Sequence, residues 1–277
     1  MMHATPASSP SYVLGHANEE LDRLIEQARF IGDLTAQVLT LAGLGEGMRV
    51  LDVGCGAGDV SFLAAQMVGP TGAVIGIDRS AEAIQVAEQR ARQAGLTNVR
   101  FQVADITELV INEPVDALIG RLVLMYFADP AALLRRLATF VAPGGIIAFQ
   151  ELATDGATSE PYCSVLHATA QRIVQTFERV GADPRAGMKL CRFFEGAGLP
   201  APQMILGGRV EQGPDSAVYE WIAQLARTLL PVMQRTGVAT PEEVDIETLA
   251  SRMRDEAVAL NAILLPPPFI GAWTRKP

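Results

Sequence analysis

Five polar side chains stand where apolar runs of the chain end and loops begin. They are Asp52, Asp78, Asp105, Arg121 and Glu151. Short apolar runs bounded by glycine and polar residues are typical of buried strands. Ligands of open α/β sheets bind beyond the carboxyl ends of the strands, so side chains at those ends should converge. Carboxylates accept hydrogen bonds from hydroxyl and amino groups, and the convergence predicts a site for a small molecule that carries such groups.

Three glycines at alternate positions, Gly54, Gly56 and Gly58, follow the first of these acids. Glycine permits sharp turns and lets a ligand approach backbone that a Cβ would cover. The helical pattern that begins at Val60 presents unpaired N–H groups at the end of the loop. This stretch predicts a strand, a ligand-holding loop and a helix. The nicotinamide fingerprint G-x-G-x-x-G requires a glycine where Asp59 stands, which disfavours a nicotinamide oxidoreductase.

The second and third acids fit the two halves of a nucleoside. Asp78 ends the apolar run 73–77, and a carboxylate at the tip of the second strand can accept two hydrogen bonds from a ribose diol. Asp105 follows the alternating run 99–103, where it can accept a hydrogen bond from an exocyclic amine. Ile106 can then cover an aromatic ring. The alternative for each acid is an ordinary helix cap.

Strand and helix patterns alternate five times up to residue 149, which predicts a parallel, doubly wound α/β sheet with helices on both faces. Helices over about 161–180 and around 190–194 then interrupt the alternation. A sixth strand is expected around 203–210 and a last one at 269–273, with a helical insertion between them in which Pro231 should kink or end a helix. Both insertions should hang over the edge that carries the glycine loop and build an acceptor pocket.

Two helices are expected before the glycine loop, one capped by Asn18 and a second capped by Asp33 and ending at Gly43. Ordinary packing and a solvated surface are the simpler explanation of these helices with Tyr12 and His16, and a lid over the ligand is the functional alternative. The chain is therefore divided as one large domain with four parts: 1–43, an arm and lid helices; 44–152, a cofactor-binding core; 153–200, a helical insertion after strand five; and 201–277, strands six and seven with an inserted helical substrate cap.

Composition excludes several classes of function. The chain has 277 residues, a formal net charge of -9 and 49% hydrophobic residues. An acidic protein is a poor partner for nucleic acid, and no run approaches the roughly 18 apolar residues of a membrane span. Three cysteines without a C-x-x-C spacing indicate neither a disulfide framework nor a zinc site. Met1 to Ser11 lacks the regions of a secretory signal, so we expect a soluble, cytoplasmic protein.

At this point the chain resembles the class I S-adenosylmethionine-dependent methyltransferases, most closely over 48–149. The segments that carry the resemblance are Leu51–Gly58, Asp78, Asp105, Gly120–Leu124 and the Pro143–Gly145 turn. The resemblance implies a Rossmann-like seven-stranded sheet of order 3-2-1-4-5-7-6 with strand 7 antiparallel. It implies S-adenosylmethionine as cofactor, S-adenosylhomocysteine as product, and a glycine loop that holds the cofactor's amino-acid end. Residues 12–24 resemble the leading segment of actinobacterial small-molecule methyltransferases.

The residues at the motif positions are predicted to bind the cofactor, together with Arg79 next to Asp78 and Ile106 next to Asp105. They are Tyr12, Asp52, Gly54, Gly56, Gly58, Asp78, Arg79, Asp105, Ile106 and Arg121.

Methyl transfer from a sulfonium is an in-line displacement, and holding the acceptor at about 3 to 3.5 Å in a dry site supplies much of the acceleration. A base is needed only if the acceptor loses a proton. His167 and Tyr126 are the first candidates, with Glu151 and Tyr162 behind them, and packing is the alternative role for each. Glu151 with Asp155 could chelate magnesium only in a forced arrangement, so no metal is expected.

The acceptor is predicted to be a small, largely apolar molecule of specialised metabolism, methylated on oxygen, nitrogen or an aromatic carbon such as that of an indole. The Asn/Asp-Pro-Pro-Tyr motif of related amino-group methyltransferases is absent, and Gly120–Val123 stands in its place. The alternative is a non-catalytic cofactor-binding regulator or partner subunit with a blocked acceptor pocket. The apolar face of Trp221, Ile222, Leu225 and Leu229 fits either a lid or the interface of a homodimer.

Overall fold

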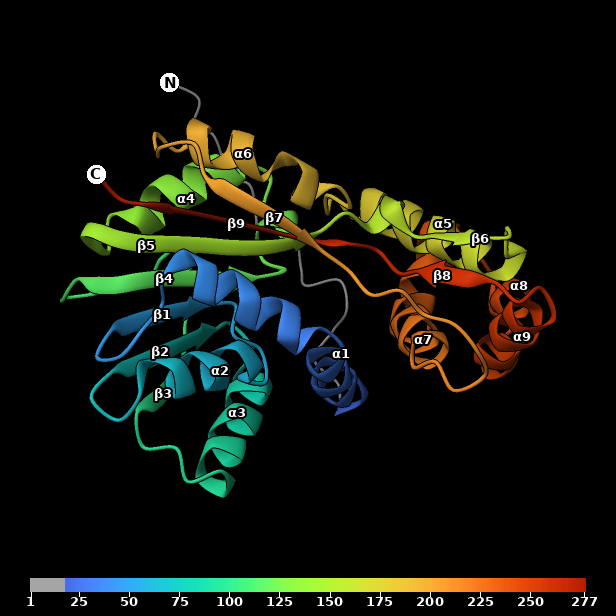
Figure 1. Ribbon diagram of the computed structural model, residues 1–277, viewed down its shortest axis with the longest axis horizontal. Helices are drawn as coiled ribbons and strands as arrows, with labels where there is room; N and C mark the ends of the chain where they lie inside the picture. The colour runs from blue at the N-terminus through green and yellow to red at the C-terminus, as the bar shows by residue number, and fades with distance from the viewer. Residues whose placement is uncertain (1–17) are drawn as a thin grey trace.

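A computed structural model describes residues 18–277, with side chains from Phe30 onward. Its main feature is a seven-stranded sheet of order β3-β2-β1-β4-β5-β9-β7 (Figure 1). The strands are β1 (Arg49–Val53), β2 (Ala73–Asp78), β3 (Val99–Val103), β4 (Val115–Arg121), β5 (Val141–Leu152), β7 (Gln203–Gly207) and β9 (Phe269–Arg275). The first five are parallel, and β9 runs antiparallel to both β5 and β7. With β7 and β9 counted as strands six and seven, the predicted order and the antiparallel last strand are confirmed.

Helices cover both faces of this sheet. On one face α1 (Asn18–Ala42), α2 (Asp59–Val68) and α3 (Ala81–Gln93) contribute to a single apolar cluster with β1, β4 and β5. On the other face α4 (Pro130–Ala138) and α6 (Ala186–Gly196) bury Leu133, Leu134, Leu190 and Phe194. The central strands β1, β4 and β5 are mostly buried between these helices, which explains why their sequences are nearly continuous apolar runs, whereas the edge strands β3 and β7 are largely exposed.

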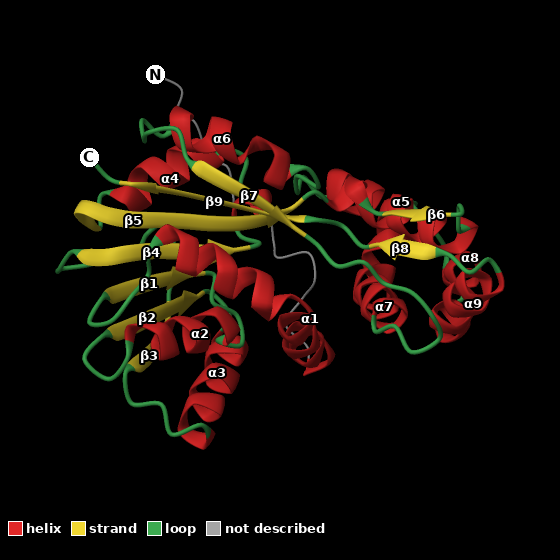
Figure 2. Ribbon diagram, viewed as in Figure 1, coloured by secondary structure: helices red, strands yellow, loops and turns green. Residues whose placement is uncertain are grey.

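A second unit, here called the cap, lies beyond the carboxyl end of β5 (Figure 2). It consists of α5 (Ser164–Arg179), α7 (Val218–Thr236), α8 (Pro241–Val244), α9 (Ile246–Ala259) and the two-stranded sheet of β6 (Thr158–Glu160) and β8 (Ile263–Leu265). A capping box begins α8, since Thr240 accepts from the Glu243 amide and the Glu243 side chain accepts from the Thr240 amide. The cap thus stands at the edge where β1 to β5 end, whereas α6, which belongs to the first of the two predicted insertions, packs on a face of the sheet.

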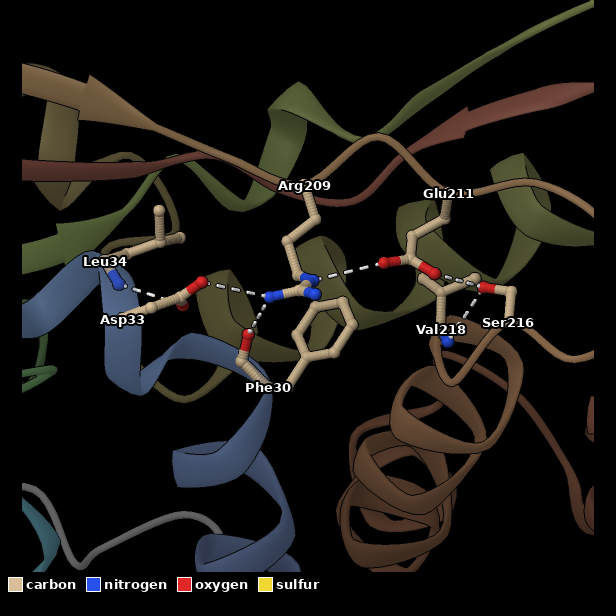
Figure 3. Close-up of polar contacts among 7 residues, drawn as sticks. All are labelled: Phe30, Asp33, Leu34, Arg209, Glu211, Ser216 and Val218. Carbon is tan, nitrogen blue, oxygen red and sulfur yellow. Dashed lines mark hydrogen bonds and ion pairs between the residues drawn. The ribbon is translucent and has the colours of Figure 1, made fainter.

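The cap is joined to α1 by Arg209, in the segment between β7 and α7 (Figure 3). Arg209 Nη1 lies 3.3 Å from the Phe30 carbonyl oxygen and 3.4 Å from Asp33 Oδ2, and its Nε lies 3.1 Å from Glu211 Oε1. The guanidinium also lies 5.1 Å from the centre of the Phe30 ring. On the cap side, the ring of Trp221 in α7 stacks on Phe30 with centroids 4.9 Å apart. An apolar stack with a polar surround therefore holds α7 against α1.

Two predicted element boundaries are wrong, and one alternative for Pro231 does not hold. The two expected N-terminal helices form one continuous helix, α1, and Asp33 lies inside it because the apolar pattern continues through that residue. Of the two effects expected of Pro231, a kink or a helix end, the second does not occur, because α7 continues past the proline and Leu229 and Val232 on either side of it stay buried. The Pro143–Gly145 turn lies within β5, which already begins at Val141. No helix in the described part of the chain is long and apolar enough to cross a membrane.

Candidate functional site

The glycine loop joins β1 to α2 and depends on all three of its glycines. Gly54, Gly56 and Gly58 have φ angles of 68°, 53° and 91°, a region that side chains rarely adopt. A Cβ on Gly54 would lie 2.6 Å from Val123 Cγ2, and one on Gly58 would lie 2.8 Å from the Phe62 ring. The glycines therefore let the loop turn sharply and let Val123 and Phe62 pack directly against its backbone.

Asp78 stands at the end of β2 with its carboxylate fixed by backbone groups. Its Oδ2 accepts from the Gly56 amide and its Oδ1 from the Ser80 amide, each at 2.9 Å. The first bond ties the acid to the centre of the glycine loop. A carboxylate oxygen has more than one lone pair, so both oxygens keep acceptor capacity for a diol.

Asp52 and Arg121 form the buried centre of the site. Ser61 Oγ donates to Asp52 Oδ2 at 2.6 Å, yet burial dominates and raises the pKa of Asp52 to about 7. Arg121, at the end of β4, donates from Nη1 to Thr35 Oγ1 at 3.1 Å, and Thr35 donates in turn to Gln150 Oε1 at 2.8 Å. Burial lowers the pKa of Arg121, while the charges of Asp59 and Asp52 raise it. This network ties α1 to the ends of β4 and β5.

Asp105 is held ready to accept further hydrogen bonds in its ionised form. The Thr107 hydroxyl donates to Oδ1 at 2.6 Å and the Thr107 amide at 2.7 Å, and the hydroxyl contact is the largest of the effects that lower the pKa of Asp105. The charge of Arg79 lowers it further. Ile106, the next residue, is buried. The structure thus brings together most of the predicted strand-end residues, while Tyr12 lies outside the described residues.

The two predicted base candidates lie apart. His167 is in the cap, where Nε2 is 3.2 Å from Ser159 Oγ and the ring stacks on Tyr162 at 4.2 Å. These contacts do not join His167 to the strand ends. Tyr126 lies in η1 (Leu124–Tyr126), a 3-10 turn that follows β4, and packs against the apolar cluster that contains Phe30 and Trp221.

With this geometry established, comparison with known proteins decides the family. A family profile described as "Methyltransferase domain" matches residues 44–191. The chain belongs to this methyltransferase family. The ubiquinone biosynthesis O-methyltransferase of Albidiferax ferrireducens is 36% identical over 108 residues, which cover 38% of this chain and 42% of the relative. The aklanonic acid methyltransferase of a Streptomyces species is 38% identical over 104 residues, 37% of this chain and 47% of the relative. Each of these matches spans less than half the length of the relative.

Solved methyltransferase structures share the fold. A SAM dependent methyltransferase from Aquifex aeolicus superposes with a TM-score of 0.51 at 24% identity, over 72% of this chain and 93% of that one. A putative methyltransferase from Bacillus halodurans gives a TM-score of 0.59 at 15% identity, over 88% of this chain and 98% of that one. The resemblance to class I S-adenosylmethionine-dependent methyltransferases and the Rossmann-like fold are thereby confirmed. S-adenosylmethionine is the cofactor of this family.

The methyltransferase core fits such a cofactor on its own geometry. The glycine loop turns sharply at the carboxyl end of β1, and acids with acceptor capacity stand at the end of β2 and after β3. Within the described residues no group of three or more His, Cys, Asp or Glu side chains is arranged to hold a metal ion.

Two further residues of the site were not assigned to cofactor binding from the sequence. Arg90, on α3, lies 2.7 Å from Asp59 Oδ1 through Nη2 and donates from Nη1 to the Ala57 carbonyl at 2.6 Å. This clamp on the glycine loop gives Asp59 a role in place of the third glycine. Glu151 is fully buried, and its Oε1 accepts from the amides of Val123 at 2.9 Å and Leu124 at 2.7 Å. The acid after the β5 run was visible in the sequence, but its partners in the β4 loop were not.

Proposed function

We propose that this protein transfers a methyl group from S-adenosylmethionine to a small, largely apolar acceptor without a metal ion. The observation that carries the proposal is the glycine loop at the end of β1, whose Gly56 amide donates to Asp78 at the end of β2. Bound there, the cofactor supplies an electrophilic methyl group on a sulfonium. The rest of the reaction requires only that the chain's own residues bind, orient and exclude water.

In this proposal, different strand-end residues bind different parts of the cofactor. Asp78 holds the ribose diol, and Asp105 with Ile106 holds the adenine, flanked by Arg79. The glycine loop and Asp52 face the amino-acid end, where the buried guanidinium of Arg121 offsets the charge of a carboxylate. The acidic side chains around Arg121 keep it charged despite its burial.

The acceptor would lie between the strand ends and the cap. The apolar cluster of the cap also contains Phe30 of α1, Met125 of η1 and Leu152 at the end of β5, and the partly buried Leu122 and Tyr126 lie against it. Names of relatives include trans-aconitate and aklanonic acid methyltransferases, which supports a small-molecule acceptor. Oxygen, nitrogen and aromatic carbon all remain acceptor atoms within the proposal, as does a role in specialised metabolism.

Position favours Tyr126 over His167 as a side chain that contacts the acceptor, because Tyr126 lies in the short segment that directly follows β4. His167 is retained as the second candidate base. The free cysteines Cys55, Cys163 and Cys191 support a reducing, cytoplasmic setting. The apolar face of α7 is buried within the cap cluster, which supports a cap role for it over a dimer interface.

Calorimetric titration of the purified protein with S-adenosylmethionine and, separately, with NAD tests the proposal. We expect binding of the first alone, and Asp78→Ala should weaken it by at least about tenfold, because two hydrogen bonds to the ribose are lost. Asp255→Ala, which removes an exposed carboxylate of α9, is the matched control and should leave the affinity unchanged. Equal binding by the Asp78 variant would refute the site. Phenols, amines and indoles are then screened for labelled methyl transfer.

A further inference from the structure

The segment after β4, residues 122–126, is here called the β4 loop, and the end of β5 holds its backbone. Leu122 has a positive φ of 57°, and its amide donates to the Gln150 carbonyl at 2.9 Å. The next two amides, of Val123 and Leu124, donate to Glu151 Oε1. Three successive amides of the loop are thus bound by two successive residues of β5, and Glu151 supplies the side-chain contact.

The other side of the β4 loop touches the glycine loop. The side chain of Val123 lies so close to Gly54 that a Cβ there would be 2.6 Å from Val123 Cγ2 and 3.6 Å from Cγ1. Since packed atoms do not interpenetrate, a shift of Val123 changes the space above Gly54. A continuous path of contacts therefore runs from Glu151, through the amide and side chain of Val123, to the loop that would hold the cofactor.

The carboxyl of Glu151 has one engaged oxygen and one without a partner. Its side chain is 0% exposed, and Oε2 has no hydrogen-bond partner in the part of the chain that the structure describes. A proton on Oε2 would leave Oε1 free to accept from the loop, but as a neutral acceptor. Hydrogen bonds to an ionised carboxylate are roughly twice as strong as those to a neutral group. The strength with which Glu151 holds the β4 loop therefore depends on whether Oε2 carries a proton.

Burial raises the pKa of Glu151 to about 7, opposed by the loop amides and reinforced by the charge of Asp183. Asp183 itself is paired with Lys189 Nζ at 2.6 Å. Further charged or titratable side chains lie on the elements around Glu151. They include Arg121 at the end of β4, Tyr126 in η1, the ion pair of Asp155 in η2 with Arg185 before α6, Cys191, Arg192 and Glu195 in α6, and Asp33 in α1. Both protonation states are accessible near neutral pH.

We propose that Glu151 is a positioning residue for the cofactor: its carboxylate holds the β4 loop against Gly54, and taking up a proton loosens that hold. This inference rests on the proposed function, because the glycine loop must bind the cofactor for the coupling to be felt. Since the ionised form holds the loop more firmly, cofactor binding should favour it and release protons near neutral pH.

The test is calorimetric titration with S-adenosylhomocysteine, which binds without reacting, from about pH 6 to about pH 8. Glu151→Gln keeps an oxygen for the loop amides but cannot ionise. We expect the wild-type affinity to rise about three- to tenfold more over this range than that of the variant. Asp52, the other carboxyl with a pKa near 7, is present in both proteins, so the difference isolates Glu151.

The matched control is Glu256→Gln in the cap. Glu256 also accepts from two successive amides, those of Ser164 at 2.8 Å and Val165 at 2.9 Å, but at the start of α5. This variant should keep the wild-type affinity and its pH dependence. Titration in buffers of different ionisation enthalpy should show proton release for the wild type and the control, and less for Glu151→Gln.

The outcomes separate the two proposals. Absence of S-adenosylhomocysteine binding by the wild type at every pH refutes the proposed function and this inference with it. Binding with the same pH dependence and proton release in Glu151→Gln as in the wild type refutes the inference alone. If Glu151→Gln does not fold, Val123→Ala decides: it retains the acid but removes the contact with Gly54, so it should bind more weakly and lose the same part of the pH dependence.

Discussion

Charged side chains are used differently at the carboxyl edge of the sheet and at the junction between α1 and the cap. At the sheet edge Asp52 and Glu151 are buried, and burial raises the pKa of each to about 7. At the junction Asp33 and Arg209 keep 68% and 38% of their side-chain surface exposed, and Arg209 lies beside three oxygen atoms and one ring (Figure 3). Burying charge is costly unless it is compensated, whereas surface ion pairs contribute little.

The difference indicates that the sheet edge is less optimised for stability than the junction. Buried carboxyl groups with raised pKa values do not stabilise the fold at neutral pH, and perturbed pKa values cluster at functional sites. The cap is instead held to α1 by the Phe30–Trp221 stack, with ions only at its rim. We therefore expect changes at the sheet edge to affect cofactor binding strongly, and changes at the junction to affect it little.

The largest effect should follow Gly54→Ala. The new Cβ would meet Val123 Cγ2 at 2.6 Å in a residue with a φ of 68°. We expect loss of S-adenosylmethionine binding and a destabilisation of about 2 to 4 kcal/mol, measured by calorimetry and urea unfolding. Gly95→Ala is the matched control, because Gly95 has a φ of 66° but nothing within 4 Å of a Cβ. If both variants lose the same stability, backbone strain alone explains the result and the contact with Val123 does not matter.

The pH dependence of stability tests the buried charges directly. The pKa of Asp52 is raised from 3.8 to about 7, so the native state binds more protons than the unfolded state between these values. Its contribution to stability is therefore largest below about pH 4 and is lost as the pH rises toward about 7. Asp52→Asn should remove this decline, so that the wild type loses about 2 to 4 kcal/mol more than the variant between about pH 4 and pH 8.

Urea unfolding across that pH range is the measurement. Asp116→Asn provides a comparison, because Asp116 is an exposed residue of β4 that accepts from the Arg49 amide at 2.8 Å. It should leave the slope unchanged. Parallel pH profiles of stability for wild type and Asp52→Asn would show that Asp52 is not the source of the decline. Glu151 would then be the only one of the two buried carboxyls left to distinguish the sheet edge from the junction.

Much of the fold and of the candidate site could be predicted because it depends on local sequence patterns. The apolar run, the acid and the spaced glycines around Asp52 are adjacent in the chain, so their strand, loop and helix follow from short-range rules. The seven-strand order came from the family resemblance. The clamp of Arg90 on Ala57 and Asp59 and the bond from Val123 to Glu151 join residues roughly 30 apart, and no local pattern marks such pairs. The β6–β8 pairing joins three-residue strands about a hundred residues apart, too short for a periodic signal.

Of the changes at the sheet edge and at the junction, Arg209→Ala should have the smallest effect. The variant loses contacts with Asp33, Glu211 and the Phe30 carbonyl, all partly screened by water, and the position over the Phe30 ring. We expect a destabilisation of only about 1 kcal/mol, with the affinity for S-adenosylmethionine unchanged within about twofold. Arg227→Ala, which removes a single exposed ion pair with Glu247 in the cap, should cost less still. A large loss of cofactor affinity in Arg209→Ala would mean that the position of the cap affects the glycine loop through the junction. The sheet edge alone would then not determine the affinity for S-adenosylmethionine.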